Sequence, residues 1–260
     1  MTRRNWQREE LLLALNLYCK LPFGKYHSHN SDIIKLAGLI DRTPDAVAMK
    51  LSNFASFDPV HQSRGIKGLQ NAGQSDREIW NEFHSNWDTL AVESELIYAR
   101  LSGEAESIGP LVSPTDLVEL VPFEGPTEAD REVKVRLGQR FFRKVILASY
   151  AYQCCMCGMP IPGLLVASRI IAWRDNENLR VNPYNGLCLC ALHDKGFDRG
   201  LFTLGEAYEI IIGRAAREHL SHSAVQQAFG VYEGQVIHLP DKFIPDQAFL
   251  AYHRNHYFVR

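Results

Sequence analysis

Four potential metal ligands constrain the fold of this chain more than any other feature. Cys154 and Cys157 form a C-x2-C pair, and Cys190 and His193 form a C-x2-H pair after a long loop. Zinc prefers four thiolate or imidazole ligands in a tetrahedron, and this spacing is typical of structural zinc sites. Gly158 follows the first pair and tolerates the left-handed turn that a zinc knuckle often requires. The sequence therefore predicts a closed zinc site made by these four ligands.

Two further cysteines leave the ligand set open. Cys155 can replace Cys154, and Cys188 can replace His193 by forming a C-x-C pair with Cys190. All of them can instead be small buried side chains, which is the common state of a free cysteine. Because no signal peptide is evident at Met1 and the cysteines are clustered, we expect metal binding in a reducing cytoplasm rather than disulfides.

Other polar residues lie within the same segment, which contains SRIIAW (168–173), NGLCL (185–189) and FDRG (197–200). Together with the zinc pattern, these motifs resemble the HNH, or ββα-metal, endonuclease family. Its restriction-type branch reads roughly C-x2-C, SHI-x2-W, NGL-x-L and FD-x-G. The resemblance covers roughly residues 131–260 and is specific across 154–202.

The resemblance implies two short strands and a helix that hold one divalent cation. In such families an Asn orients the attacking water, and the helix supplies metal ligands nine and thirteen positions later. Asn185, Asp194 and Asp198 match that spacing. The two aspartates are four residues apart and share a helix face, and their oxygen atoms suit Mg²⁺ or Mn²⁺. His193 is then either the fourth zinc ligand or a ligand of the catalytic cation.

A solvated helix face is the other interpretation of Asp194 and Asp198. Two acids towards the end of a short helix oppose its dipole, however, and Gly196 between them weakens the helix. These choices favour a functional role for both aspartates.

Arg169 departs from the family pattern, because the family has its general base, a histidine, at this position. An arginine cannot accept a proton near neutral pH. Three explanations are open: the residue was substituted to trap a complex, the protein is a naturally inactive relative that binds DNA, or another residue is the base. Loss of a general base costs about 10²- to 10⁴-fold in rate, so we expect poor cleavage.

The N-terminal part predicts helices at 6–20, 32–40 and 44–56, the last opened by Thr43 as N-cap and Pro44 in the first turn. The short turn between the second and third helices resembles Myb-like helix-turn-helix modules. A DNA-reading third helix would turn outward Arg42, Asp45, Ala48, Met49, Ser52 and Asn53. An ordinary three-helix bundle is the alternative, favoured by the sparse charge of this helix, whose one cation is Lys50.

Further cations extend the predicted DNA surface. Arg64 and Lys67 lie beside glycines in a loop, and Arg136, Arg140 and Arg143 fall close to one face of a helix expected at 128–150. The predicted DNA-binding residues are therefore Arg42, Lys50, Asn53, Arg64, Lys67, Arg136, Arg140 and Arg143.

The whole pattern predicts an α+β protein with a helical recognition domain at 1–102, a linker at 103–127 and a zinc-stabilised nuclease domain at 128–260. A helix at 75–101, strands at 208–213 and 235–240, and a closing helix at 246–258 complete the expected elements. The linker is rich in Pro, Gly, Ser and acidic residues. The chain has 260 residues, 46% of them hydrophobic, which is enough for one large or two modest cores.

The formal net charge is −2, so any nucleic-acid surface must be local. No apolar run reaches the length of a membrane span. We expect a homodimeric, cytoplasmic HNH endonuclease that hydrolyses double-stranded DNA of foreign origin with Mg²⁺ or Mn²⁺ and carries structural zinc. A DNA-binding protein that has lost its chemistry, and a purely structural or interaction module, are the alternatives.

Overall fold

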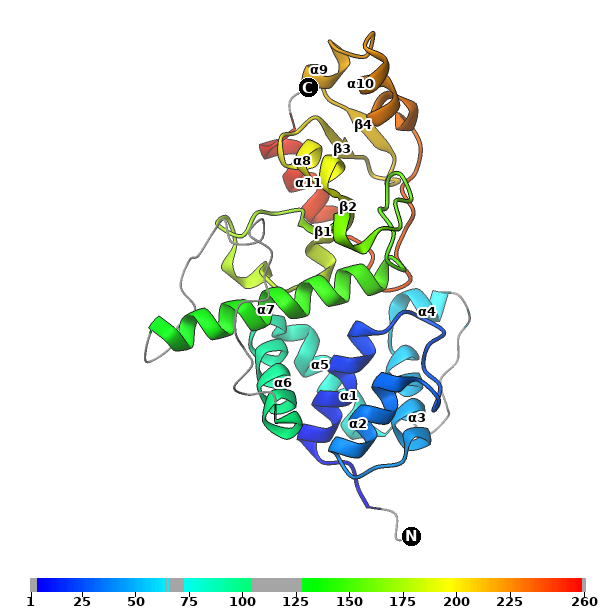
Figure 1. Ribbon diagram of the computed structural model, residues 1–260, viewed down its shortest axis with the longest axis vertical. Helices are drawn as coiled ribbons and strands as arrows, with labels where there is room; N and C mark the ends of the chain where they lie inside the picture. Colours follow the sequence, from blue (N-terminus) through cyan, green and yellow to red (C-terminus); the bar gives the residue numbers. More distant parts are fainter. Residues whose placement is uncertain (1–3, 64, 66–72, 104–127, 259–260) are drawn as a thin grey trace. The chain divides into compact units, whose positions relative to one another are not determined.

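Helices make up most of the N-terminal half in the computed structural model, which describes residues 4–63, 65, 73–103 and 128–258 (Figure 1). Side chains are described from Glu132 onwards in the last of these ranges. The described residues form two compact units, one within Met1–Val145 and Glu177–Asn182, and the other within Ile146–Asn176 and Pro183–Arg260.

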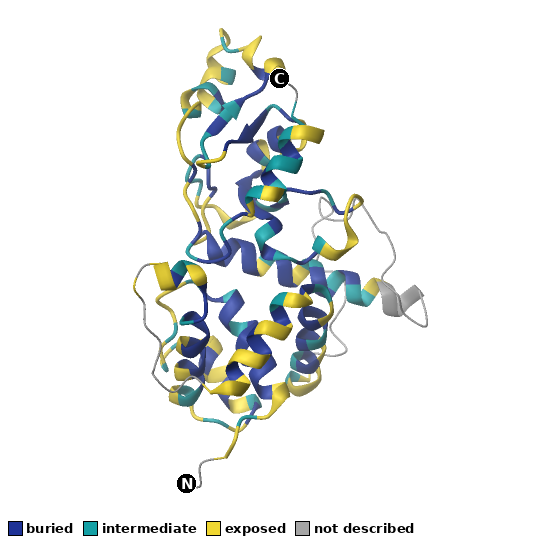
Figure 2. Ribbon diagram, turned by 180° about the vertical axis from the view of Figure 1, so that it is seen from behind, coloured by how far each residue is buried: buried dark blue, intermediate teal, exposed yellow. Residues whose placement is uncertain are grey.

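The first unit is a helical bundle around a central helix. Its helices are α1 (Arg8–Lys20), α2 (Ser31–Leu39), α3 (Pro44–Ala55), α4 (Pro59–Ser63), α5 (Gln74–Ser85), α6 (Trp87–Ser102) and α7 (Glu128–Ser149), of which α7 belongs to this unit up to Val145. Helix α1 contacts α2, α3, α5 and α6. Its apolar residues Leu12, Leu15 and Tyr18 are fully buried, and Figure 2 shows the buried faces of the helices in dark blue. Burial of these side chains provides the main stabilisation of the bundle.

The expected start of the third helix is confirmed, and one expected helix is wrong. Thr43 caps α3, where its hydroxyl accepts a hydrogen bond from Ala46 N at 3.2 Å, and Pro44 is the first helical residue. The single helix expected at 75–101 is broken at Asn86, whose backbone is not helical (φ −148°, ψ 66°). The Asn86 side chain accepts a hydrogen bond from Thr89 N and starts α6 instead. Asn favours such caps because its side chain competes with helical hydrogen bonds.

The second unit contains the expected two strands and a helix. Strand β1 (Leu165–Arg169) pairs antiparallel with β2 (Gly186–Cys190), with Leu165 opposite Cys190 and Arg169 opposite Gly186. Helix α8 (Ala191–Asp198) follows β2 directly and contacts both strands (Figure 1). The predicted α+β class is confirmed, and the ββα arrangement places the strand ends beside the helix.

A small hairpin and further helices complete this unit. Strand β3 (Phe202–Leu204) pairs antiparallel with β4 (Ile210–Ile212), and the helices are α9 (Arg214–Arg217), α10 (Ser223–Ala228) and α11 (Gln247–His256). Short 3-10 helices of this unit lie at η3 (Pro162–Leu164), η5 (Pro183–Asn185) and η6 (Gly230–Tyr232), whereas η4 (Glu177–Leu179) belongs to the first unit. The strand expected at 208–213 is β4 in shorter form. The strand expected at 235–240 is wrong, since a single bridge between Glu209 and Val236 is formed there.

The compact units divide the chain differently from the predicted domains. Residues 128–145 and Glu177–Asn182 group with the first unit, whereas the prediction gave them to the nuclease domain. Apart from residue 103, the predicted linker lies outside the described residues. The functional boundaries therefore stay predictions. Among the described residues, no helix combines the length and the apolar character that a membrane crossing requires.

Candidate metal centre and active site

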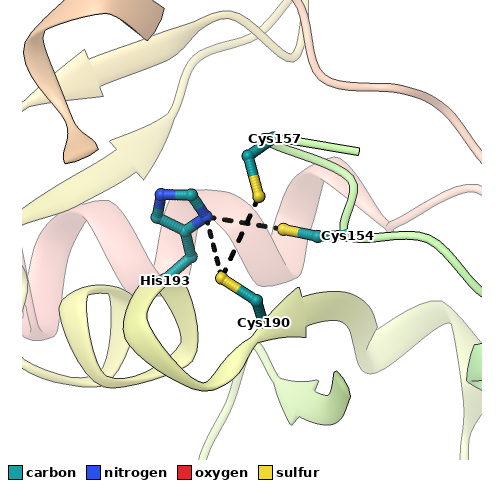
Figure 3. A group of neighbouring side chains, drawn as sticks. All are labelled: Cys154, Cys157, Cys190 and His193. Atoms are coloured by element: carbon teal, nitrogen blue, oxygen red, sulfur yellow. Dashed lines mark hydrogen bonds between the residues drawn. The ribbon is translucent and has the colours of Figure 1, made fainter. Parts of the chain in front are cut away.

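Cys154, Cys157, Cys190 and His193 gather at one point, as the sequence predicts (Figure 3). Their four ligand atoms all lie within 4.8 Å of one another. His193 Nδ1 is 3.5 Å from Cys154 Sγ and 3.3 Å from Cys190 Sγ, and the sulfurs of Cys157 and Cys190 are 4.0 Å apart. The edges of a tetrahedron with zinc–ligand bonds of ordinary length are about 3.5–3.8 Å. The donors and their spacing therefore fit a zinc ion.

Local backbone structure brings the two ligand pairs together. The amide of Gly158 donates to Cys154 O at 2.8 Å, and Gly158 has φ +71°, so the first pair lies on a tight turn. Cys190 ends β2, and His193 lies in the first turn of α8. His193 Nε2 hydrogen-bonds Ala228 O at 2.8 Å, which fixes the ring and leaves Nδ1 facing the sulfurs. Such an outer hydrogen bond typically orients a metal-binding histidine.

The thiols of the cluster differ in acidity. Hydrogen bonding with Cys190 lowers the pKa of Cys154, and the same interaction raises the pKa of Cys190 to about 11. Zinc binds thiolates, so metal binding here is coupled to proton release.

The alternative ligands Cys155 and Cys188 stay outside the metal-binding group. Both are buried, and the amide of Cys155 donates to Cys188 O at 2.7 Å. Burial is also the main reason that the pKa of Cys155 is raised well above its ordinary value. The ligand set first expected is thus the one that the structure assembles, and Cys155 and Cys188 are core side chains.

Arg169 is the last residue of β1 and is half-buried. Its guanidinium carbon lies 4.6 Å from the centre of the Trp173 ring, a cation–π contact. The sequence motif contains both residues, but spacing alone did not predict that the ring would support the guanidinium. This contact orients Arg169 at the strand end, the position where the family pattern has its histidine.

Asn185 holds the two ends of the loop that joins β1 and β2. Its side-chain oxygen accepts from Ile171 N at 2.8 Å, its amide nitrogen donates to Ile171 O at 3.0 Å, and its own carbonyl accepts from Ile170 N at 3.0 Å. The residue is 1% exposed. These contacts engage the carboxamide with the loop backbone, and the expected role of Asn185 in orienting water stays a prediction. In this geometry Asn185 joins the two ends of the loop between β1 and β2.

Asp194 and Asp198 both lie on α8, with Asp194 half-buried and Asp198 exposed. Asp194 is in the first helical turn, where the helix dipole favours an acid. Asp194 therefore does not oppose the helix dipole, contrary to the expectation. Asp198, at the end of the helix, does oppose it, and the dipole favours a functional role for Asp198 alone. Within the described ranges, no second group of three or more His, Cys, Asp or Glu residues gathers as a metal site.

The glycines of this segment have packing roles. A side chain at Gly196 would come within 2.7 Å of the Phe229 ring, so the weak helix former is explained by close packing. Gly200, in FDRG, has φ +66° and would place a side chain 2.1 Å from Tyr257 O. Replacement of Gly196 or Gly200 by a larger residue would therefore strain the packing, for reasons unrelated to catalysis.

Tyr257 is a residue of this region that the sequence argument missed. Its hydroxyl accepts from Ala172 N at 3.3 Å and hydrogen-bonds the Asp175 carboxylate, and burial is the main cause of its raised pKa. It therefore ties the C-terminal segment to the loop that follows Arg169. In the sequence, Gly200 of FDRG indicates that another backbone segment comes close. It does not indicate that this segment contains Tyr257.

Three of the residues predicted to contact DNA form internal pairs in the first unit. Arg42 Nη2 bonds Glu10 at 2.7 Å, and Lys50 Nζ and Asn53 Nδ2 bond Asp76 at 2.6 and 3.0 Å. Lys50 and Asn53 are buried because an amphipathic helix turns this face to the core. The expected outward orientation is wrong for Asn53 and Ala48, and Arg42 is largely covered, as its side chain is 10% exposed.

The outward residues of α3 are Asp45, Met49 and Ser52, none of which is a cation. Helix α7 carries more accessible cations than α3. Arg140 is exposed and Arg143 is half-buried, whereas Arg136 pairs with Glu132 at 3.2 Å. Arg64 and Lys67 lie outside the described residues. Cations for a phosphate surface in the first unit are therefore better placed on α7 than on α3.

Residues 154–205 match a family model described as HNH endonuclease. A search of curated proteins finds no match. The matched segment contains the four cluster ligands, β1, β2, α8 and the FDRG turn. This segment is thus similar to HNH endonucleases, and its Cys3His cluster can hold a metal such as zinc.

Proposed function

We propose that this protein is a metal-dependent HNH DNA endonuclease of the restriction or defence type. The observation that carries the proposal is the β1–β2–α8 arrangement beside the Cys3His cluster, within the segment that matches the HNH family. The strand end with Arg169 and the helix with Asp194 and Asp198 belong to the same small motif.

Asp194 and Asp198 are the proposed ligands of Mg²⁺ or Mn²⁺. Carboxylates four residues apart on a helix share a face, and hard divalent cations prefer oxygen ligands. Such an ion supplies Lewis acidity for a scissile phosphate when it is bound. Cys154, Cys157, Cys190 and His193 would hold zinc in a closed, structural set and keep β2 and α8 in place.

Asn185 and Arg169 take different roles in this proposal. Asn185 fixes the loop between the strands through the Ile171 backbone and so positions the end of β1. Arg169 stays cationic and can bind a phosphate, but it cannot take a proton from water. We therefore expect slow hydrolysis from the chain as it stands, unless another residue is the base.

The proposed substrate is double-stranded DNA, met in the cytoplasm. Exposed Arg140 and neighbouring Arg143 on α7 support phosphate contact, since phosphate pairs supply most sequence-independent affinity. Cleavage of both strands at a symmetric site needs two active sites, so we also propose a homodimer.

A DNA-binding protein that has lost nuclease chemistry is the second candidate, and Arg169 over Trp173 favours it. An arginine in place of the family's histidine favours phosphate binding and also removes the general base.

The experiment is incubation of the unaltered chain with plasmid and phage DNA, modified and unmodified, in Mg²⁺, Mn²⁺ or EDTA. Metal-dependent cleavage supports the endonuclease and assigns the base to a residue other than Arg169. Retention of DNA without cleavage supports the second candidate. Absence of both cleavage and binding on all substrates contradicts both.

A further inference from the structure

The second unit contains a pocket whose lining does not include the residues proposed for hydrolysis. It has a volume of ≈ 510 Å³ and is bordered by the β3–β4 hairpin, α9, α11 and the residue Phe258. Ile211 and Phe258 give it apolar walls, and three arginines, Arg214, Arg217 and Arg254, line it as well. Arg169, Asn185, Asp194 and Asp198 do not border it.

Arg254 differs from the other two arginines of this pocket in its partner. Its Nη1 donates to Leu204 O at 2.7 Å, which anchors the half-buried side chain from α11 against β3. Among the residues that the structure describes, no carboxylate forms an ion pair with Arg254. Arginine has five donors in a planar fork, so most of them stay available to a ligand.

The other two arginines are held by exposed carboxylates. Arg214 pairs with Glu218 at 2.9 Å, and Arg217 pairs with Glu233 and also donates to Ile212 O at 3.3 Å. The side chains of Arg214 and Arg217 are 72% and 53% exposed. Exposed ion pairs contribute little to stability, so both guanidiniums can exchange a carboxylate for a stronger anion.

We propose that this pocket binds a nucleotide through its phosphate. Guanidiniums bind phosphate oxygens in bidentate pairs, and three of them suit a dianionic group better than a single carboxylate. Ile211 and Phe258 offer apolar surface, and an aromatic ring stacks on a base regardless of base identity. The volume lies in the range of small-ligand sites. This inference does not depend on nuclease activity.

The test is calorimetric titration of the full chain, at low salt, with thymidine 5′-monophosphate and with thymidine. We expect the nucleotide to bind at least about tenfold more tightly than the nucleoside, because the phosphate supplies the charge-assisted hydrogen bonds. Arg254→Gln should weaken nucleotide binding by about tenfold or more. Arg217→Gln should also weaken nucleotide binding. Because Arg217 is exposed, its replacement should not disturb folding, so this variant tests the pocket even if Arg254→Gln does not fold.

Arg199→Gln is the matched control, since Arg199 is an exposed arginine that does not border the pocket. Its affinity should stay within about twofold of the unaltered chain. A short oligonucleotide with a 5′-phosphate separates two sources of the ligand: binding of this strand through the same arginines assigns a strand end, and binding of the mononucleotide alone assigns a free nucleotide. Absence of binding by either ligand overturns the proposal. So does binding that Arg254→Gln and Arg217→Gln leave unchanged.

Discussion

Arg169 and Asn185 illustrate how single residues of the HNH segment differ from what their positions suggest. The carboxamide of Asn185 accepts a hydrogen bond from Ile171 N and donates one to Ile171 O, so it ties β2 to the loop that follows β1. Arg169 packs on Trp173 and has chemistry that excludes a base. The chemistry of the side chain, and not the strand backbone, therefore excludes Arg169 as a general base.

His253 gives a prediction at the residue scale. It is 1% exposed, stacks on Phe197 with ring centres 3.7 Å apart, and hydrogen-bonds Thr203 and Phe197 O. Burial lowers its pKa to about 4. Above the ordinary pKa both folded and unfolded states hold a neutral ring, whereas between about 6.5 and 4 the unfolded state binds the proton.

Folding stability should therefore fall as pH drops through this window. We expect the free energy of unfolding to be about 2 kcal/mol lower at pH 5 than at pH 7 because of this group. Urea unfolding of the unaltered chain and of His253→Gln measures the difference. An equal loss of stability in both proteins would show that His253 does not titrate on unfolding.

At the scale of elements, helix α3 is held to α5 by a buried polar group. Asp76 on α5 is 0% exposed and bonds both Lys50 and Asn53 on α3. The Lys50 ammonium also lies 4.8 Å from the Trp6 ring centre. Removal of Asp76 would leave a buried cation without its carboxylate.

We predict that Asp76→Ala lowers the free energy of unfolding by about 3–5 kcal/mol. Asp45→Ala is the control, because Asp45 is exposed on α3 and such changes usually stay within about 0.5 kcal/mol. Thermal and denaturant unfolding give both values. A loss below about 1 kcal/mol for Asp76→Ala would mean that Lys50 finds another partner.

The strand–helix junction at Cys190 gives a second prediction at this scale. Because the four donors are spaced for zinc, we expect about one zinc per chain by elemental analysis. Cys157→Ser should remove zinc and cost on the order of 3 kcal/mol or more, since zinc binding stabilises the fold that it closes.

Cys188→Ala is the matched control. Cys188 is buried in β2 but is not among the cluster ligands, so this variant should keep its zinc. Zinc loss in Cys188→Ala with retention in Cys157→Ser would reverse the ligand assignment.

At the scale of the whole molecule, a net charge of −2 requires that DNA affinity come from a local cationic surface. We predict that Arg140→Gln weakens binding to double-stranded DNA and lowers the slope of log affinity against log salt by about 1. Fluorescence anisotropy across a salt series measures it. Arg100→Gln is the control, because Arg100 is an exposed arginine on α6 that pairs with Glu9. This variant should keep the salt slope of the unaltered chain. An equal change of slope in both variants would contradict a DNA-binding role for α7.

Much of the fold could be predicted, because its signals are local. The cap at Thr43, the apolar periodicity of α1 and the cysteine spacing each depend on neighbouring residues, and the structure confirms them. The break at Asn86 was missed because its side chain caps α6 inside a continuous helical pattern.

Long-range contacts account for what the sequence did not reveal. Asn53 was expected to face outward and Lys50 to contact DNA, but both bond Asp76, which is 23 and 26 positions away, respectively. Tyr257 reaches Asp175 across 82 positions, and Phe229 explains Gly196. Each depends on which elements pack together, and one sequence does not determine that.

We propose that Arg169 stands at the general-base position of an HNH nuclease site. The most direct measurement compares plasmid cleavage by the unaltered chain, Arg169→His, and Arg169→His combined with Asp198→Ala, in Mg²⁺ or Mn²⁺. We predict that Arg169→His raises the cleavage rate by about 10²-fold or more and that the second change abolishes the gain. A folded, zinc-containing Arg169→His protein that cuts no faster than the unaltered chain would contradict the account.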